Sequence, residues 1–323
     1  MRKCPRNLTE FEANFPTEEA CRVYLARLRW PAGFRCARCG LGKAWRVRGL
    51  WECAGCGYQT SVTAGTIFQD TRIPLLVWFR AMWWMTGQAH AASALELRRA
   101  LGLKRYETAW RLLHKLRRAM VRPGRDLLTG RVEVDGCYVG GRDKRLPGRH
   151  WDKGLMVVAA EEDGRGIGRI RIRQIVRAST ANLVAFVQDS VAPGSVIHTY
   201  NWRKDLPLKS KGYRQKVTFP EKKKKKKKKT PWEAMPRARY VISRFERWLM
   251  GTHQGAVRRE HLDYYLDEFT FWFNLRQSQN HGELFFRLAQ QAVTVDPVIR
   301  HRILHPTSVK AQPQSAGDTE IPE

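Results

Sequence analysis

The hydrophobic residues of this chain recur with two different periods, and the change of period marks its organisation. Between Pro74 and Met120 apolar side chains return every three or four residues, as in amphipathic helices. From Arg131 they alternate with polar residues or run together, as in strands, and the helical period returns at Ala238. We expect helices over residues 8–28, 74–85, 91–101, 104–120, 181–191, 238–249 and 261–275, and strands over 131–139, 155–160, 169–175, 196–199 and 216–219.

The second half of the chain therefore runs strand, strand, strand, helix, strand, strand, helix. Three successive strands can form an antiparallel meander, and the helix then returns the chain to a central parallel pairing. This is the element order of an RNase H-like mixed sheet. The predicted fold class is α/β (α+β), with this sheet and its helices following a smaller N-terminal region.

Four of the seven cysteines form two copies of one short pattern. Cys36 and Cys39 make the first C-x-x-C pair, Cys53 and Cys56 make the second, and a glycine follows each pair. Each such turn places two thiolates on one side of a metal, and two turns complete a tetrahedral zinc site. Four protein ligands leave no open position, so a zinc ion there is structural. The alternative interpretation is two redox-active or free thiol pairs.

The changes of pattern also divide the chain into regions. Residues 1–60 are expected to form the zinc ribbon with a helical lead-in, and 61–125 a helical region that ends in a linker, Arg-Pro-Gly-Arg. Residues 126–300 are the expected RNase H-like domain. The polar tail over 301–323 is expected to be disordered.

The charge of the chain points to a polyanionic partner. There are 59 Lys and Arg against 30 Asp and Glu, a net charge of +29. Nucleic acid is the expected partner, and an anionic membrane surface is the weaker alternative. No apolar run reaches the roughly 18 residues of a membrane span, and the N-terminus lacks a secretory signal, so we expect a cytoplasmic, nucleoid-associated protein.

The helices over 91–101 and 104–120 resemble a helix-turn-helix, because a turn containing Gly102 joins them. The second helix carries basic residues opposite its apolar face. That basic face consists of Arg105, Arg111, His114, Lys115, Arg117 and Arg118. The candidate DNA contacts are Arg105, Arg111, Lys115 and Arg118. A structural helix pair with a solvated basic face is the alternative.

Acidic residues suggest a second kind of chemistry. Phosphoryl transfer by two metal ions needs carboxylates from separate elements that converge on Mg²⁺ or Mn²⁺. Asp135 lies in the first strand of the predicted sheet, with Glu133 on the same face, and Glu246 lies in the late helix. The fourth strand has no acid at its tip, and Asp205 is the nearest one downstream. An exposed polar strand face is the alternative for Glu133 and Asp135.

Several motifs in order resemble bacterial insertion-sequence transposases of the DDE type with a zinc-ribbon N-terminus, the family numbered fifteen-ninety-five. The resemblance covers most of residues 8 to about 300. The motifs are Arg-Trp-Pro before CARCG, then CGYQTSVTAGTIF, LGLKRYETAWRLLHKLRRAM, VEVDGCYVGG, RWLMGTHQG and HLDYYLDEFTFWFN.

This resemblance implies DNA transposition with Mg²⁺ or Mn²⁺: cutting at the ends of the element and joining 3′-hydroxyls to target DNA. It also implies that the ribbon and helix-turn-helix bind terminal inverted repeats, and that the protein works as a homo-oligomer because two ends must be joined. Asp135 matches the first catalytic aspartate of the family.

The chain departs from the family at the other catalytic positions. The second aspartate falls on Tyr200, and Asp205 stands where the family has tyrosine. A phenol, with a pKa of about 10, is a poor metal ligand beside a carboxylate. The third position falls on Arg244, with Glu246 two residues on.

Two hypotheses follow from these departures. The first is a transposase that cuts and joins DNA with an adapted site, and the second is a catalytically inactive DNA-binding protein that occupies or represses element ends. The lysine run over 222–229 fits a degraded copy, or a loop that grips phosphates nonspecifically. The long strand-rich region argues against a third class, a zinc-ribbon transcription or RNA-binding factor.

Overall fold

The computed structural model describes residues 4–88, 90–122, 124–139, 154–202, 207–219, 230–253, 257–278 and 280–297. The chain divides into two compact units. The first comprises Met1–Gly124 with Leu275–Leu304, and the second comprises Arg125–Asn274 with His305–Glu323. Each unit has its own core. Among the described residues no helix is both long and apolar enough to cross a membrane.

The first unit combines a small antiparallel sheet with helices. Its strands, in the order β1-β2-β3, are β1 (Ala44–Val47), β2 (Leu50–Cys53) and β3 (Gln59–Thr60). Its helices are α1 (Leu8–Asn14), α2 (Glu18–Arg29), α3 (Leu75–Thr86), α4 (Ala94–Ala100), α5 (Tyr106–Ala119) and α10 (His281–Ala292).

The helix expected over residues 8–28 is two helices. The Thr17 side chain accepts a hydrogen bond from the Ala20 N–H and so caps α2. Pro16, directly before it, has no N–H with which to continue α1. The sequence interpretation missed this break because the apolar spacing continues across it.

The position of α10 differs from the division made on sequence, which carried the RNase H-like domain to residue 300. Phe285 of α10 is fully buried in the first unit, where its ring packs edge-on against Phe11 and Phe79. The apolar face of α10 therefore completes the aromatic core of the first unit, which takes in Leu275–Leu304.

The second unit is built on a five-stranded mixed sheet in the order β6-β5-β4-β7-β8. Strands β4, β5 and β6 pair antiparallel, whereas β7 pairs parallel with both β4 and β8. Its elements are β4 (Arg131–Val139), β5 (Gly154–Asp163), β6 (Gly166–Ile175), α6 (Thr180–Ser190), β7 (Val196–Tyr200), η1 (Lys209–Lys211), β8 (Arg214–Thr218), α7 (Pro231–Ala234), α8 (Pro236–His253), η2 (Arg259–His261) and α9 (Leu262–Asn274). This topology confirms the predicted RNase H-like mixed sheet.

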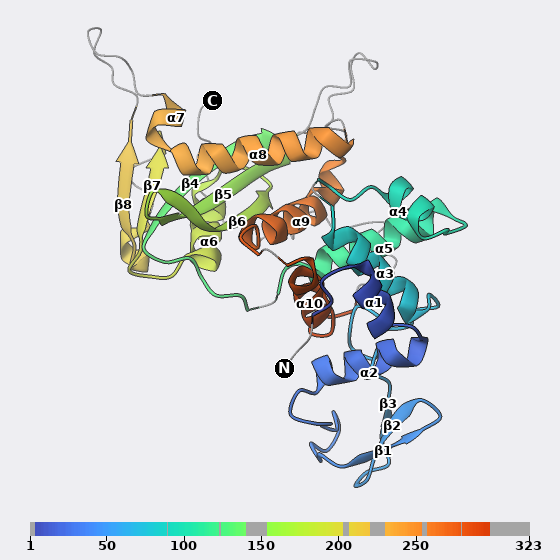
Figure 1. The fold of residues 1–323 in the computed structure, drawn as a ribbon. Coiled ribbons are helices and arrows are strands. Elements are labelled where there is room, and N and C mark those ends of the chain that lie inside the picture. The colour runs from blue at the N-terminus through green and yellow to red at the C-terminus, as the bar shows by residue number, and fades with distance from the viewer. Residues whose placement is uncertain are drawn as a thin grey trace, which may run out of the picture. The chain divides into compact units, whose positions relative to one another are not determined.

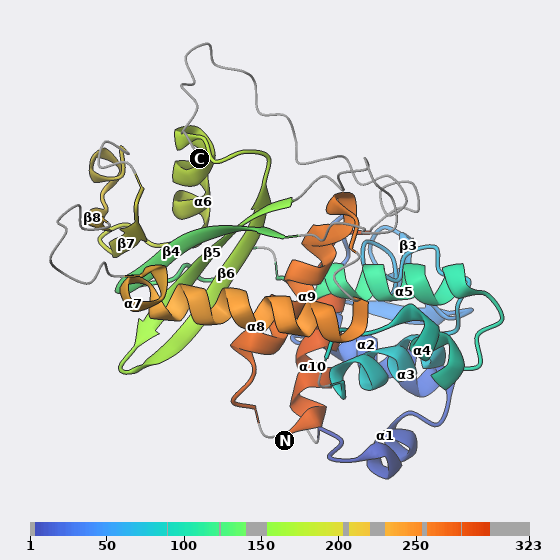
Figure 2. The same ribbon diagram turned by 90° about the horizontal axis from the view of Figure 1, so that it is seen from above.

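Helices cover both faces of this sheet (Figures 1 and 2). Val132 and Val134 of β4 face α6 and belong to one buried cluster with its Phe186. On the opposite face, residues of β5 and β6 pack against α8 and α9. Because strand side chains alternate, Glu133 and Asp135 of β4 point to the α8 face. The alternation predicted for this strand is confirmed.

Candidate functional site

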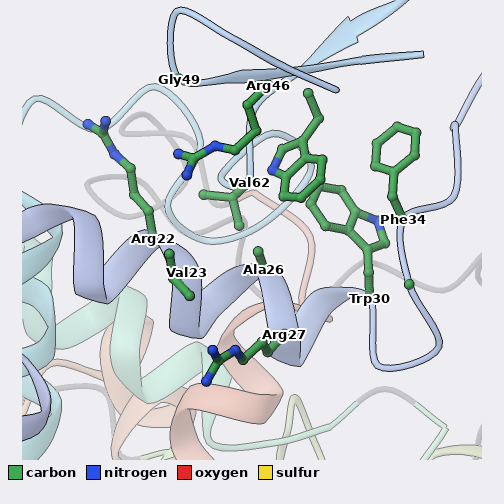
Figure 3. A pocket seen from close by; sticks show the side chains of 11 residues that line it. Arg22, Val23, Ala26, Arg27, Trp30, Phe34, Arg46, Gly49 and Val62 are labelled. Atoms are coloured by element: carbon green, nitrogen blue, oxygen red, sulfur yellow. The ribbon is translucent and has the colours of Figure 1, made fainter. Parts of the chain in front are cut away.

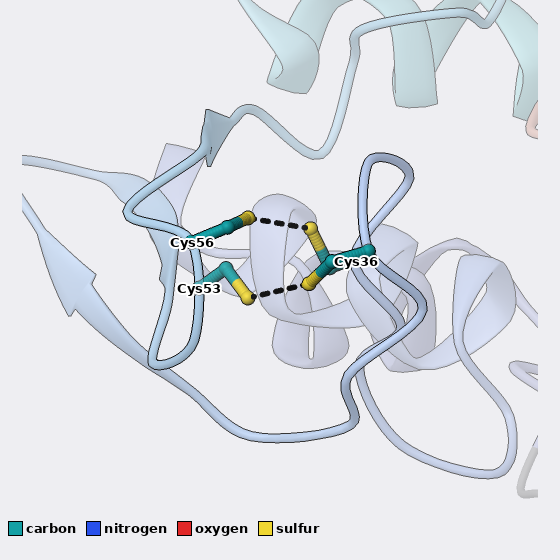
Figure 4. Close-up of side chains that lie close together, drawn as sticks. Cys36, Cys53 and Cys56 are labelled. Carbon is teal, nitrogen blue, oxygen red and sulfur yellow. Dashed lines mark hydrogen bonds between the residues drawn. The ribbon is translucent and has the colours of Figure 1, made fainter.

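The four paired cysteines come together at the tip of the first unit's small sheet (Figure 4). The Sγ atoms of Cys36 and Cys56 lie 3.6 Å apart, and those of Cys39 and Cys53 lie 3.4 Å apart. All four ligand atoms lie within 4.8 Å of one another. A tetrahedron with a Zn–S distance of about 2.3 Å has S···S edges of roughly 3.8 Å, so this donor set fits zinc.

Local backbone geometry produces the cluster. Gly40 and Gly57 adopt positive φ angles of 76° and 66°, which close each C-x-x-C turn. Burial opposes ionisation of Cys36, but the N–H groups of Cys39 and Arg38 outweigh it and lower the pKa of this thiol to about 6. A thiol that ionises readily is prepared to bind a metal.

Glu133, the first acid of the Glu-x-Asp pair, has a structural role. Its carboxylate accepts hydrogen bonds from the N–H groups of Arg237 (2.8 Å) and Ala238 (2.9 Å), in the first turn of α8. The Arg237 guanidinium adds an ion pair to Glu133 at 3.2 Å. Glu133 is 4% exposed, so these contacts satisfy a buried charge and fix the start of α8 on the sheet.

Asp135, the second acid, is held by a cation from α8. Its Oδ2 lies 2.6 Å from Nε of Arg239 in an ion pair that lacks hydrogen-bond alignment, while Oδ1 accepts from the Gly136 N–H at 2.8 Å. Burial raises the pKa of Asp135, and the positive charge of Arg239 works against that rise. The carboxylate therefore has its counter-charge within the protein.

Tyr200 is the last residue of β7. The parallel pairing of β4 with β7 ends at Glu133 and His198, and Asp135 and Tyr200 each lie two residues beyond that last pair on their own strands. The Tyr200 side chain packs against a cluster at the start of α8 and just before it, which consists of Ala234, Met235 and Ala238. Position 200 therefore faces α8, on the same side of the sheet as Asp135.

Of the other two acids proposed from the sequence, the structure describes Glu246 alone. Glu246 is exposed on α8. It lies near enough to Cys137 to act on it together with Asp135: burial first, and then the negative charges of Glu246 and Asp135, raise the pKa of the Cys137 thiol to about 12. Asp205 lies outside the described residues.

Among the residues that the structure describes, the donors around Asp135 do not fit a two-metal site. Asp135 is paired with an arginine, and the neighbouring strand offers a phenol in place of a carboxylate. Within the described parts of the chain, the four cysteines are the one group of three or more His, Cys, Asp or Glu side chains whose ligand atoms converge.

The basic helix α5 presents only part of the face expected from its sequence. His114 and Arg117 are buried, and Arg117 donates to the Ala92 carbonyl at 2.6 Å. Lys115 is half-buried, with Nζ 3.4 Å from the Ile67 carbonyl. The buried face of α5 is wider than its apolar residues predict, because α5 packs against three helices, α3, α4 and α10. Arg105 and Arg118 are exposed, and Arg111 is partly exposed.

Comparison with known proteins identifies the family. A family model described as the ISXO2-like transposase domain matches residues 127–274, and one described as a transposase zinc-ribbon domain matches residues 16–59. Together they span more than half of the chain. The chain belongs to this family of insertion-sequence transposases with a zinc-ribbon N-terminus.

Two further similarities were found. An uncharacterized protein in transposable element ISH50 of Halobacterium salinarum is 28% identical over 144 residues, which cover 42% of this chain and 48% of that protein. The match thus spans about half the length of the relative. A simian T-cell lymphotropic virus intasome, solved in complex with PP2A regulatory subunit B56 gamma, aligns at 12% identity and a TM-score of 0.30, covering 58% of this chain and 69% of that one. So low a score does not bear on fold or function.

The sequence interpretation missed Arg239 as a partner of Asp135. The sequence did contain a signal for it. Arg239 lies seven residues before Glu246, the acid proposed on this helix, so the two residues share one helix face. It also missed Arg237, whose contact with Glu133 depends on the start of α8 at Pro236 and not on any sequence motif.

Proposed function

We propose that this chain is the DNA-binding transposase of an insertion sequence, that it binds the terminal inverted repeats of the element, and that strand cleavage by the chain as it stands is blocked at position 200. The observation that carries the catalytic part is the environment of Asp135. Its counter-charge is Arg239, and its neighbour on β7 is Tyr200 where the family has aspartate.

DNA binding is assigned to the first unit. Helices α4 and α5 pack together through a turn in which Gly102 has a φ of 62°, which gives the connection expected of a helix-turn-helix. Arg105, Arg111 and Arg118 are the proposed phosphate or base contacts. Lys115 is the weaker candidate, because its ammonium group is drawn toward Ile67 and burial lowers its pKa.

Loss of catalysis follows from charge and ligand chemistry. Two-metal phosphoryl transfer uses several carboxylates to hold cations near the reacting phosphate. A tyrosine in place of aspartate at position 200 and a guanidinium at Asp135 leave less negative charge where it would be needed. The competing function is an active transposase in which Asp205 supplies the second carboxylate.

The remaining assignments follow from the same proposal. Joining two element ends requires more than one active unit, so we propose a homo-oligomer on DNA. The binding of element ends places the protein in the bacterial cytoplasm, on the nucleoid. Target DNA is the second proposed nucleic-acid partner.

Fluorescence anisotropy with duplexes that carry the element's terminal repeats tests the binding assignment. We expect the full chain to bind these duplexes more tightly than scrambled ones. Arg105→Ala, Arg111→Ala and Arg118→Ala together should weaken binding and reduce the salt slope by up to about 2 to 3, roughly 0.9 for each phosphate that the protein no longer neutralises. Arg214→Ala, at an exposed position in β8, is the matched control. Equal affinity for repeat and scrambled DNA would refute recognition of the repeats.

A further inference from the structure

A cavity lies between α2 and the zinc-ribbon sheet of the first unit (Figure 3). Its volume is about 280 Å³, near the lower end for ligand cavities. One wall comes from α2, and the other comes from β1, β2 and the neighbouring loops. The lining residues are Arg22, Val23, Ala26, Arg27, Trp30, Gly33, Phe34, Arg46, Gly49, Trp51 and Val62.

The aromatic part of the cavity is built rigidly. Trp30 meets Phe34 and Trp51 in edge contacts, with ring centroids 5.2 Å and 5.5 Å apart. All three rings belong to the cluster that buries Cys36 and Cys53. The shape of the cavity therefore depends on the same packing that assembles the cysteine cluster.

Arg29, at the end of α2, fixes the wall of the cavity that contains Val62. Its Nη1 donates to the carbonyls of Ser61 (3.0 Å) and Val62 (2.8 Å), and its guanidinium carbon lies 5.1 Å from the centroid of the Trp30 ring. This arginine holds the Val62 segment against the end of α2. The indole of Trp30 is thereby supported by a cation as well as by its aromatic neighbours.

Positive charge surrounds the open side. Arg22 and Arg46 line the cavity from opposite walls, and Figure 3 shows Arg46 reaching from the sheet toward α2. Arg22 pairs with Glu18 at 3.7 Å, and Arg46 pairs with Glu19 at 2.5 Å. All four side chains are at least one-third exposed, so these pairs are weak enough to exchange for a phosphate.

From this arrangement we propose that the cavity takes one unpaired nucleotide of a DNA strand, with the base against Trp30 and Trp51 and a flanking phosphate between Arg22 and Arg46. Aromatic platforms beside a cationic groove are the usual means of holding single strands without reading sequence. The inference rests on the proposed function, because it assigns the unpaired nucleotide to DNA at the ends of the element.

A single-stranded dT 12-mer with one central 2-aminopurine tests the proposal. Stacking in the cavity should quench the probe when the full chain binds. Val23→Trp fills the cavity from a position that is 36% exposed, and it should abolish quenching and weaken binding of this strand about tenfold. Arg46→Ala should weaken binding about fivefold. Arg38→Ala, at an exposed ribbon position outside the lining, should stay within twofold of the wild type.

Duplex binding separates failure of this inference from failure of the proposed function. Val23→Trp should keep its zinc and bind terminal-repeat duplex within twofold of the wild type. If the wild type binds duplex but does not quench the probe, or if Val23→Trp quenches it fully, the nucleotide cavity is refuted and end binding stands. If the wild type binds no DNA, both proposals fall.

Discussion

Nε of Arg239 in α8 lies 2.6 Å from Oδ2 of Asp135 in β4. The aspartate is 4% exposed, so the arginine supplies the positive charge that a buried carboxylate requires. We propose, from the family resemblance, that Asp135 corresponds to the first catalytic aspartate. In this chain the protein itself neutralises that aspartate.

The first prediction concerns this ion pair. Arg239→Met should destabilise the second unit by about 2–4 kcal/mol, because it leaves the Asp135 charge buried and unpaired. Urea unfolding measures the change. Adding Asp135→Asn should recover most of the lost stability, and Arg247→Met, at an exposed position of the same helix, should change it by less than about 0.5 kcal/mol. A loss below that value for Arg239→Met would contradict the pairing.

The second prediction concerns Glu133. Its carboxylate accepts two backbone hydrogen bonds from the first turn of α8, so Glu133→Ala should cost about 2–3 kcal/mol of unfolding free energy. Thermal or urea unfolding checks this value. Glu246→Ala, an exposed change on α8, is the control and should be nearly neutral. If the two variants were equally stable, Glu133 would not anchor the helix.

The third prediction is a pH dependence. Burial opposes ionisation of Glu161, but hydrogen bonds from Arg169 and from the Thr129 N–H outweigh it and lower the pKa to about 2. A lowered pKa in the folded state stabilises the protein above the unfolded pKa of about 4.5, and this stabilisation fades as the pH falls toward 2. Glu161→Gln should therefore cost about 1–2 kcal/mol at pH 7, after allowance for solvent screening.

Urea unfolding of the wild type and Glu161→Gln at pH 7, 4 and 3 measures that dependence. The difference between the two proteins should shrink steadily as the pH is lowered, while Glu12→Gln, at an exposed position of α1, should show no such trend. A difference that stayed constant between pH 7 and pH 3 would show that the Glu161 charge does not contribute.

The fourth prediction concerns zinc. The full chain should purify with one zinc ion, and Cys36→Ser or Cys53→Ser should lose it, because a structural tetrahedral site needs all four ligands. Metal analysis by mass spectrometry measures the stoichiometry. Cys137→Ser, outside the cluster, should keep the metal. Zinc-free protein that binds DNA with full affinity would show that the ribbon is not required for binding.

Much of the fold was predictable because its signals are local. The two C-x-x-C-Gly segments specify the cysteine cluster, and the alternation over Arg131–Val139 places Glu133 and Asp135 on one face. The order of strands and helices then leaves few topologies for the sheet. The family resemblance supported the same assignment through independent motifs.

The interactions that decide function were less predictable. Neither the pairing of Asp135 with Arg239 nor the burial of Arg117 has a local pattern, since each depends on how a helix rotates when it packs. The sequence already showed tyrosine at position 200 and aspartate at position 205, the reverse of the family pattern. The neighbourhood of position 200 came only from the register of β4 and β7.

Metal-dependent strand cleavage tests the central claim most directly. The full chain, Tyr200→Asp and Asp135→Ala should be incubated with terminal-repeat DNA and either Mg²⁺ or Mn²⁺, with binding measured in the same samples. We expect all three proteins to bind and the unmodified chain to leave the DNA uncut. Cleavage by Tyr200→Asp would locate the block at that position alone. Cleavage by the unmodified chain that Asp135→Ala abolishes would contradict the account and make Asp205 the next residue to replace.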